Sequence, residues 1–190
     1  MNVFFFGGTF DPPHLGHKLI YKHCINLCDK FIFVPVAQSP EKNKPIATID
    51  QRINMLESLI DISDKNKVLI DRYEIDSGIK PNYTINTIIY LKKKFRKSSI
   101  HMVLGADQYE KLSSWKNYDK IIDQVEIVCF NRNKSGIGND DNKVNFIDYD
   151  YKISSSIIRR KISNGNINKV KNHLTEEINH LICDNDLYLN

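Results

Sequence analysis

His14 and His17 stand three residues apart, after a stretch that contains two glycines, a threonine and an aspartate. A helix beginning here would place both imidazoles on one face, aimed at a common ligand, and we expect Gly16 between them to leave room for a flat one. Such a pair suits either Zn²⁺ or a phosphate. A zinc site normally takes at least three protein ligands, and no third ligand follows at a characteristic spacing. The pattern therefore favours phosphate contact over metal ligation or purely structural histidines, and we expect no metal site in the protein itself.

The residues before the histidines favour the same chemistry. Gly7 and Gly8 end a short apolar run, residues 3–6, which is typical of a strand buried on both faces of a parallel sheet. Glycine lets a backbone approach a ligand closely, and Thr9 offers a hydroxyl donor. A helix starting near Pro13 would present its first N–H groups to an anion. Every part of this turn could therefore serve phosphate binding.

Strands and helices that could position these residues alternate along the chain. The apolar patterns predict strands at residues 3–6, 31–36, 68–70, 100–104, 125–130 and 144–147, and helices at residues 15–28, 50–62, 84–95, 115–122, 154–163 and 170–182. This alternation predicts a three-layer α/β fold with a mainly parallel sheet. We expect one domain, residues 1–190, with a C-terminal helical part, about 152–190, packed on it.

Helical spacing also predicts caps and buried faces. Asp50 and Thr84 are placed to cap their helices. The side chains expected to face inward are Leu19, Ile20, Cys24 and Leu27 in the first helix, Ile53, Leu56, Leu59 and Ile60 in the second, and Ile85, Ile88, Ile89 and Leu91 in the third.

Composition narrows the classes of partner. The net charge of +4 suits an anionic small molecule as well as nucleic acid. The basic run at residues 92–97 is interpreted as a solvated helix end, and without an RNA-binding module we expect no nucleic-acid partner. No apolar run approaches the roughly 18 residues of a membrane span, so we expect no membrane partner. The N-terminus does not resemble a signal peptide, and we expect a cytoplasmic protein. The four cysteines, which form no CxxC pair, are expected to be buried free thiols: Cys24, Cys28, Cys129 and Cys183.

The first turn also resembles a known signature. Residues 7–17, Gly-Gly-Thr-Phe-Asp-Pro-Pro-His-Leu-Gly-His, closely resemble that of the nucleotidyltransferase superfamily, whose core is His-x-Gly-His. The Gly-Gly before Thr-Phe-Asp-Pro is most similar to the bacterial-type nicotinate mononucleotide adenylyltransferases. The resemblance implies a Rossmann-like nucleotidyltransferase fold. It also implies an enzyme of NAD biosynthesis that transfers the adenylyl group of ATP to nicotinate mononucleotide, releasing nicotinate adenine dinucleotide and pyrophosphate.

Further matches follow in chain order. Residues 39–42 keep only the Pro and Lys of the family's Pro-Pro-His-Lys loop, and Asn82-Tyr83-Thr84 resembles its Ser-Tyr-Thr. Gly105-Ala106-Asp107, followed by Leu112 and Trp115, is similar to the family's Gly-Ala-Asp and Leu-x-x-Trp. Arg52 matches a family arginine that is either structural or a ligand contact.

A second anion site is implied near the C-terminus. Residues 152–159, Lys-Ile-Ser-Ser-Ser-Ile-Ile-Arg, resemble the superfamily's Ile-Ser-Ser-Thr-x-Ile-Arg, with Ser156 replacing the threonine but keeping its hydroxyl. Three hydroxyls at a helix start, with Arg159 one turn further on, would suit the β- and γ-phosphates of ATP. Arg132 resembles a family arginine near the adenylate.

The resemblance assigns roles residue by residue. The catalytic residues it implies are His14, His17 and Arg159. The implied ATP-binding residues are Gly7, Gly8, Thr9, Phe10, Gly105, Asp107, Arg132, Ser155 and Ser156. The implied mononucleotide-binding residues are Lys42, Tyr83, Thr84 and Trp115, with the indole of Trp115 as the platform for the pyridine ring. Mg²⁺ would arrive with ATP and be held largely by its phosphates and water.

Several alternatives stay open at this point. The acceptor phosphate is already an anion, so we expect a direct in-line displacement without a general base or a covalent intermediate. Another small-molecule adenylyltransferase, of the phosphopantetheine type, and a catalytically silent nucleotide-binding module are the competing interpretations. Nicotinate and nicotinamide mononucleotide are not distinguished. A homo-oligomer is possible, and Asp11 either caps the helix or shapes the turn.

Overall fold

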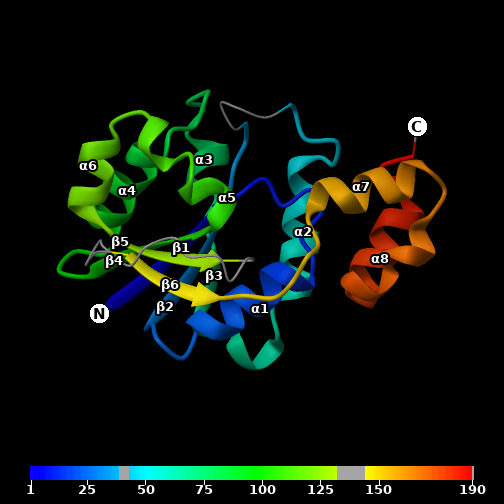
Figure 1. Cartoon of the computed structure of the whole chain (residues 1–190), viewed down its shortest axis with the longest axis horizontal. Helices are drawn as coiled ribbons and strands as arrows, with labels where there is room; N and C mark the ends of the chain where they lie inside the picture. The colour runs from blue at the N-terminus through cyan, green and yellow to red at the C-terminus, as the bar shows by residue number, and fades with distance from the viewer. Residues whose placement is uncertain (39–42, 132–143, 190) are drawn as a thin grey trace.

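A sheet of six parallel strands forms the centre of the computed structural model, which describes residues 1–38, 43–131 and 144–189 (Figure 1). The strand order is β3-β2-β1-β4-β5-β6. The strands are β1 (Asn2–Gly8), β2 (Lys30–Pro35), β3 (Val68–Ile70), β4 (Ser99–Gly105), β5 (Glu126–Asn131) and β6 (Val144–Asp148). Every neighbouring pair is parallel. The predicted α/β fold is confirmed, and among the described strands the sheet is parallel throughout.

The strand order reverses at β1, which pairs with β2 on one side and β4 on the other. Ligands of open parallel sheets bind in the crevice outside the carboxyl ends of the strands at such a reversal. Gly7 and Gly8 end β1, and Gly105 ends β4. The topology therefore places these three glycines at the edge where a ligand is expected.

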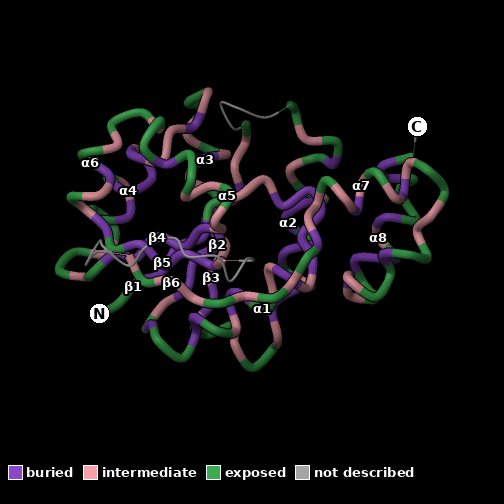
Figure 2. The backbone as a smooth tube through the Cα atoms, in the orientation of Figure 1, coloured by how far each residue is buried: buried purple, intermediate pink, exposed green. Residues whose placement is uncertain are grey.

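Helices cover both faces of the sheet and make three layers. The α-helices are α1 (Leu15–Cys24), α2 (Ile49–Leu59), α3 (Tyr73–Asp76), α4 (Thr84–Lys94), α5 (Ala106–Tyr109), α6 (Tyr118–Gln124), α7 (Ser155–Ser163) and α8 (Glu176–Asp184). Short 3₁₀ turns occupy residues 62–64, 112–114, 167–169 and 171–173. Figure 2 shows the strands buried between the helical layers, whose outer sides are exposed.

Alternation along β1 explains this layering, since successive side chains of a strand point to opposite faces. Phe4 and Phe6 share one buried cluster with Tyr21 of α1 and Leu56 of α2. Val3 and Phe5 share the other cluster with side chains of α4 and α6. Because the side chains of residues 3–6 point alternately into two apolar clusters, both faces of β1 are buried, and all four residues are apolar.

The C-terminal helices share a third buried cluster with α2. Met55 and Leu59 on α2 pack with Ile158 of α7 and Ile178 of α8. Figure 1 shows α7 and α8 beside α2, at the opposite end of the molecule from α4 and α6. Helices α7 and α8 thus pack against α2.

Two predicted helix caps are wrong. Thr48, not Asp50, caps α2: the Thr48 hydroxyl accepts from Gln51 N at 3.3 Å, and Gln51 Oε1 accepts from Thr48 N at 2.9 Å. This reciprocal box satisfies two N–H groups, whereas Asp50 lies within the first turn. Tyr83 occupies the N-cap position of α4, so Thr84 is the first helical residue rather than the cap.

Three predicted inward-facing side chains are exposed: Leu19, Leu27 and Ile89. In α1 the buried face includes Tyr21 instead of Leu19. Tyr21 is fully buried, and its hydroxyl accepts from Asp61 N at 3.0 Å. In α4 the buried face includes Thr87, whose hydroxyl donates to Glu74. Apolar spacing alone did not reveal these two polar side chains with buried partners. The remaining predicted inward positions are buried.

All four cysteines are free thiols, as predicted, but Cys183 on α8 is exposed rather than buried. None of the helices in the described part of the chain is both long and apolar enough to span a bilayer.

Candidate active site

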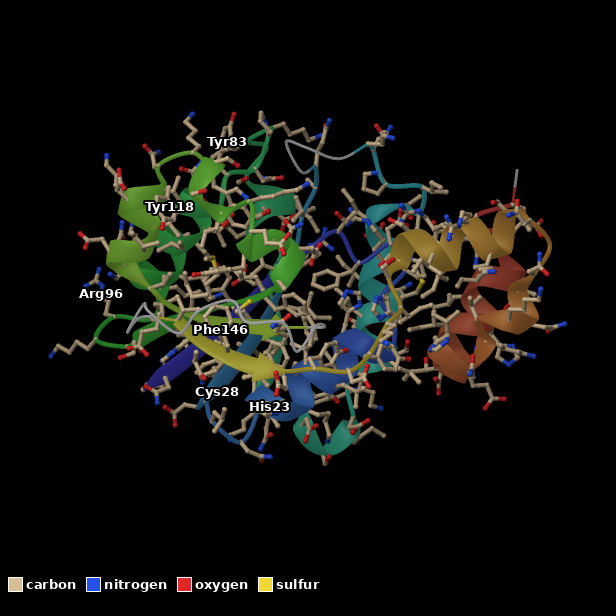
Figure 3. The ribbon with its side chains drawn as sticks, viewed as in Figure 1. His23, Cys28, Tyr83, Arg96, Tyr118 and Phe146 are labelled. Atoms are coloured by element: carbon tan, nitrogen blue, oxygen red, sulfur yellow. The ribbon has the colours of Figure 1, made fainter. Side chains whose placement is uncertain are left out.

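A cavity of about 360 Å³ opens at the carboxyl ends of β1 and β4. The predicted site residues that line it are Gly7, Gly8, Thr9, Tyr83, Thr84, Gly105 and Trp115. They come from four separate segments, which the parallel sheet and the start of α4 bring together. Figure 3 labels Tyr83 near the top of the molecule and His23 well below it, and His23 is exposed on α1.

The two glycines that end β1 differ in the space that a Cβ would have. A Cβ on Gly7 would meet no atom within 4 Å, so its backbone faces open cavity. A Cβ on Gly8 would lie 2.9 Å from Cζ of Phe10. Phe10 itself is buried, has a φ of 51°, and packs edge-on against His17 with ring centroids 5.1 Å apart. Phe10 therefore packs against the His17 ring and is not among the cavity-lining side chains.

His14 and His17 form the N-terminal cap of α1 together. His14 Nδ1 accepts from Gly16 N at 3.1 Å, and His17 Nδ1 accepts from His14 N at 3.1 Å. The two ring centroids are 3.8 Å apart. Because each Nδ1 accepts a backbone N–H, the proton of each neutral ring lies on Nε2. The cap thus fixes both tautomers as Nε2 donors, the form that suits a phosphate oxygen.

The missing side chain of Gly16 makes room for the His14 ring and Tyr149 rather than for a ligand. A Cβ there would lie 2.8 Å from both Cε1 and Nδ1 of His14 and 2.9 Å from the hydroxyl of Tyr149. The Tyr149 hydroxyl donates to Gly16 O at 2.6 Å. The expectation that Gly16 leaves room for a flat ligand is wrong, because the His14 ring and Tyr149 occupy that space.

The second predicted anion site adjoins the first turn. Arg159 Nη1 donates to Asp11 O at 2.6 Å, and Ser155 Oγ donates to Pro12 O at 2.9 Å. Arg159 Nη2 also lies 3.4 Å from the Ser156 hydroxyl, which is exposed. The start of α7 is therefore bonded directly to the segment that leads into His14. The structure places the two sites side by side, although neither Arg159 nor the histidines line the cavity itself.

The remaining predicted residues are dispersed. Asp107 is exposed at the start of α5, and its Oδ1 would lie 2.8 Å from a Cβ on Gly105. The next residue, Gln108, lines the cavity instead. Lys42 and Arg132 lie outside the described residues. No three His, Cys, Asp or Glu side chains are grouped as a metal site within residues 1–38, 43–131 and 144–189.

Arg52 and Asp11 are structural supports of the turn. Arg52 is almost fully buried, and its Nη1 donates to Thr9 O at 2.7 Å and to Val36 O at 2.9 Å. Burial lowers the pKa of Arg52, while the charge of Asp11 opposes this. The Asp11 carboxylate accepts from the backbone N–H groups of Ile46 and Ala47. Asp11 thus shapes the turn and does not cap α1, which resolves the two alternatives.

Sequence reasoning missed Glu74 as a cavity residue. Its carboxyl is buried, lines the cavity, and accepts from the Thr87 hydroxyl on α4. Burial raises the pKa of Glu74 to about 7, and the bond from Thr87 opposes that rise. No motif marked it, because its burial depends on the packing of α3 against α4. Lys116 was also missed: its Nζ lies 4.3 Å from the ring centroid of Tyr83, next to Trp115.

The fold and the site agree on one class of protein. Strand order 3-2-1-4-5-6 with a glycine turn at the switch point is typical of nucleotide-binding α/β proteins, and the histidine pair and Arg159 lie beside that turn. The family model described as cytidylyltransferase-like matches residues 5–161. The chain therefore belongs to the cytidylyltransferase-like family.

Individual relatives narrow the group. A protein of Borrelia turicatae is 34% identical over 169 residues, 87% of each chain, and one of Hydrogenobaculum is 31% identical over 192 residues, 99% of this chain and 98% of that one. Both are named probable nicotinate-nucleotide adenylyltransferase, which is the enzyme group that this chain resembles. A solved structure, Plasmodium falciparum nicotinic acid mononucleotide adenylyltransferase complexed with NaAD, superposes with a TM-score of 0.85. It is 22% identical, with 98% of this chain and 97% of that chain covered, so this likeness establishes the fold.

Proposed function

We propose that this protein transfers the adenylyl group of ATP to nicotinate mononucleotide, giving nicotinate adenine dinucleotide and pyrophosphate in NAD biosynthesis. The observation that carries the proposal is the cavity at the carboxyl ends of β1 and β4. It gathers Tyr83, Thr84 and Trp115 next to the glycine turn that leads to His14 and His17. About 360 Å³ lies within the size range of small-molecule sites.

The cavity suits the mononucleotide. Trp115 would be the platform for the pyridine ring, Tyr83 lines the same cavity, and Thr84 offers a hydroxyl at the start of α4. The backbone of Gly7 lies open to the cavity, so a ribose or phosphate could approach it without steric conflict. These residues would orient the acceptor phosphate toward the turn at the end of β1.

The histidines and Arg159 would act on the phosphates of ATP. Both Nε2 groups are set as donors by the α1 cap, and Arg159 supplies a permanent positive charge beside them. The acceptor phosphate is an anion and needs no general base. Its oxygen would attack the α-phosphorus directly, and the bond to the β-phosphate oxygen would break to release pyrophosphate. Catalysis then consists of positioning and of stabilising charge that develops in the transition state.

Mg²⁺ would enter as part of the ATP substrate. The described acidic side chains include no cluster that could hold it alone, so its ligands would be mainly phosphate oxygens and water. Asp107, exposed at the start of α5, would contact either that hydrated ion or a ribose hydroxyl. The positive charge of bound Mg²⁺ would neutralise part of the negative charge of the ATP phosphates.

We place this activity in the cytoplasm, with ATP and nicotinate mononucleotide as partners. Cys24, Cys28 and Cys129 are buried free thiols, which suits a reducing compartment. A homo-oligomer and the absence of nucleic-acid and membrane partners stay predictions from the sequence.

Pyrophosphate release tests the proposal. Purified protein would receive Mg²⁺-ATP with one acceptor at a time: nicotinate mononucleotide, nicotinamide mononucleotide or phosphopantetheine. We expect the highest kcat/KM with nicotinate mononucleotide. Activity with phosphopantetheine alone would favour the competing adenylyltransferase, and binding of ATP without release with any acceptor would favour a silent nucleotide-binding module.

A further inference from the structure

Three donors from distant parts of the chain hold the side chain of Asp11. The Asp11 carboxylate accepts from Ile46 N at 2.9 Å, from Ala47 N at 3.1 Å and from the Tyr188 hydroxyl at 2.8 Å. Tyr188 lies 177 residues further along the chain. Both Asp11 and Tyr188 are 3% exposed, so water does not compete for this bond. The turn that contains Tyr188 is thus bonded to the turn that precedes His14.

Main-chain oxygens of the same short segment hold the proposed phosphate-binding side chains. Asp11 O accepts from Arg159, and Pro12 O accepts from the Ser155 hydroxyl. The segment continues directly into His14, the N-cap of α1. Any displacement of Asp11 would therefore move the Arg159 guanidinium and the start of α1 together.

Tyr188 is itself fixed by its surroundings. It is buried in the cluster that contains Ile158 of α7 and Ile178 of α8. Its φ of 67° lies in the left-handed region, which a non-glycine residue keeps only where packing and bonding hold it. Burial and the charge of Asp11 both raise the pKa of Tyr188, so its hydroxyl stays a proton donor at neutral pH.

We propose that Tyr188 is a positioning residue for adenylyl transfer: through the Asp11 carboxylate it holds Arg159 and the His14 turn where the phosphates of ATP bind. Tyr188, which is not among the residues that line the cavity, thereby sets the geometry of the phosphate site. The turnover part of this inference rests on the proposed function, whereas its ATP-binding part does not.

Tyr188→Phe tests the inference, because it removes the hydroxyl and keeps the buried ring. Calorimetric titration with ATP, without acceptor, should give a Kd about tenfold above that of the wild type. In steady-state assays kcat/KM for ATP should fall by at least the same factor, while KM for nicotinate mononucleotide stays within twofold. Loss of a merely structural bond would not weaken the kinetics with ATP while leaving KM for nicotinate mononucleotide unchanged.

Tyr90→Phe is the matched control, because the Tyr90 hydroxyl also donates to a carboxylate, Asp71 Oδ2, at 3.1 Å. Tyr90 lies on α4, and neither it nor Asp71 lines the cavity. Both variants would be assayed at a temperature where thermal melts show them fully folded. We expect the control to keep wild-type ATP affinity. A Kd for Tyr188→Phe within twofold of the wild-type value, or an equal loss in both variants, would overturn the inference.

A double-mutant cycle with Arg159→Lys tests the route through Arg159. If Tyr188 acts by placing the guanidinium, adding Tyr188→Phe to Arg159→Lys should raise the ATP Kd by less than threefold. Independent tenfold effects that multiply would contradict the route. If the wild type binds ATP but releases no pyrophosphate with the mononucleotide, the proposed function fails, and the Kd comparison still decides the role of Tyr188.

Discussion

Replacing Glu74 by glutamine should change how the stability of the protein depends on pH. Glu74 is buried, and its pKa is raised from 4.5 to about 7. Since the unfolded chain gives up this proton near pH 4.5, the folded state binds more protons between the two values. The free energy of unfolding must therefore fall as the pH rises through this window, and become flat above about pH 7. Glutamine is neutral at every pH and can still accept from the Thr87 hydroxyl.

The size of the effect follows from the two pKa values. At 1.36 kcal/mol for each pH unit, a rise from 4.5 to about 7 corresponds to about 3 kcal/mol. Glu74 is only 6% exposed, so little solvent screening reduces this figure. Relative to Glu74→Gln, the wild type should lose about 3 kcal/mol between pH 4.5 and pH 8.

Urea unfolding of both proteins at pH 4.5, 5.5, 6.5, 7.5 and 8 would measure this difference, and the subtraction cancels the other titrating groups. Glu110→Gln is the control, because Glu110 is exposed and its replacement should leave the profile unchanged. The reasoning is refuted if the difference between wild type and Glu74→Gln stays constant to within about 0.5 kcal/mol, or if the wild type gains stability as pH rises.

Four further substitutions test the site. His17→Ala should lower kcat about a hundredfold or more while ATP affinity changes less than about threefold, as for loss of a transition-state donor; near-wild-type turnover would refute this role. Trp115→Ala should raise KM for the mononucleotide roughly 5- to 150-fold through lost stacking worth about 1–3 kcal/mol; weakening of ATP binding alone would contradict it. Gly16→Ala should lower the Tm by several degrees and impair turnover, because its Cβ would lie 2.8 Å from the His14 ring. Gly7→Ala, with nothing within 4 Å, should leave the Tm unchanged, and equal melting of the two variants would contradict the packing argument.

Local patterns predicted the fold well because the strands of a parallel sheet carry a strong signal. The run from Val3 to Phe6 is apolar on both faces, and the structure shows a core on each side of it. Helix faces were less predictable. Leu19 and Ile89 are as apolar as their buried neighbours but are exposed, whereas Tyr21 is buried with a polar partner. Periodicity does not report such partners.

Site residues could be predicted where the signal lies in a short stretch of sequence, and could not where the interacting residues are far apart in the chain. The motif residues Tyr83 and Trp115 were identified from short stretches and do line the cavity. Glu74 was missed, because its burial comes from contacts that no stretch encodes. The role of Asp11 could not be chosen from the sequence, because its partners lie 35 to 177 residues away.

A crystal structure with nicotinate adenine dinucleotide tests the central claim most directly. We expect the pyridine ring to lie against Trp115 in the cavity between the ends of β1 and β4. An oxygen of the phosphate attached to adenosine should then lie about 2.7–3.2 Å from Nε2 of His14 or His17. A dinucleotide with adenine in this cavity, or with both phosphates beyond hydrogen-bond reach of the histidines, would contradict the account.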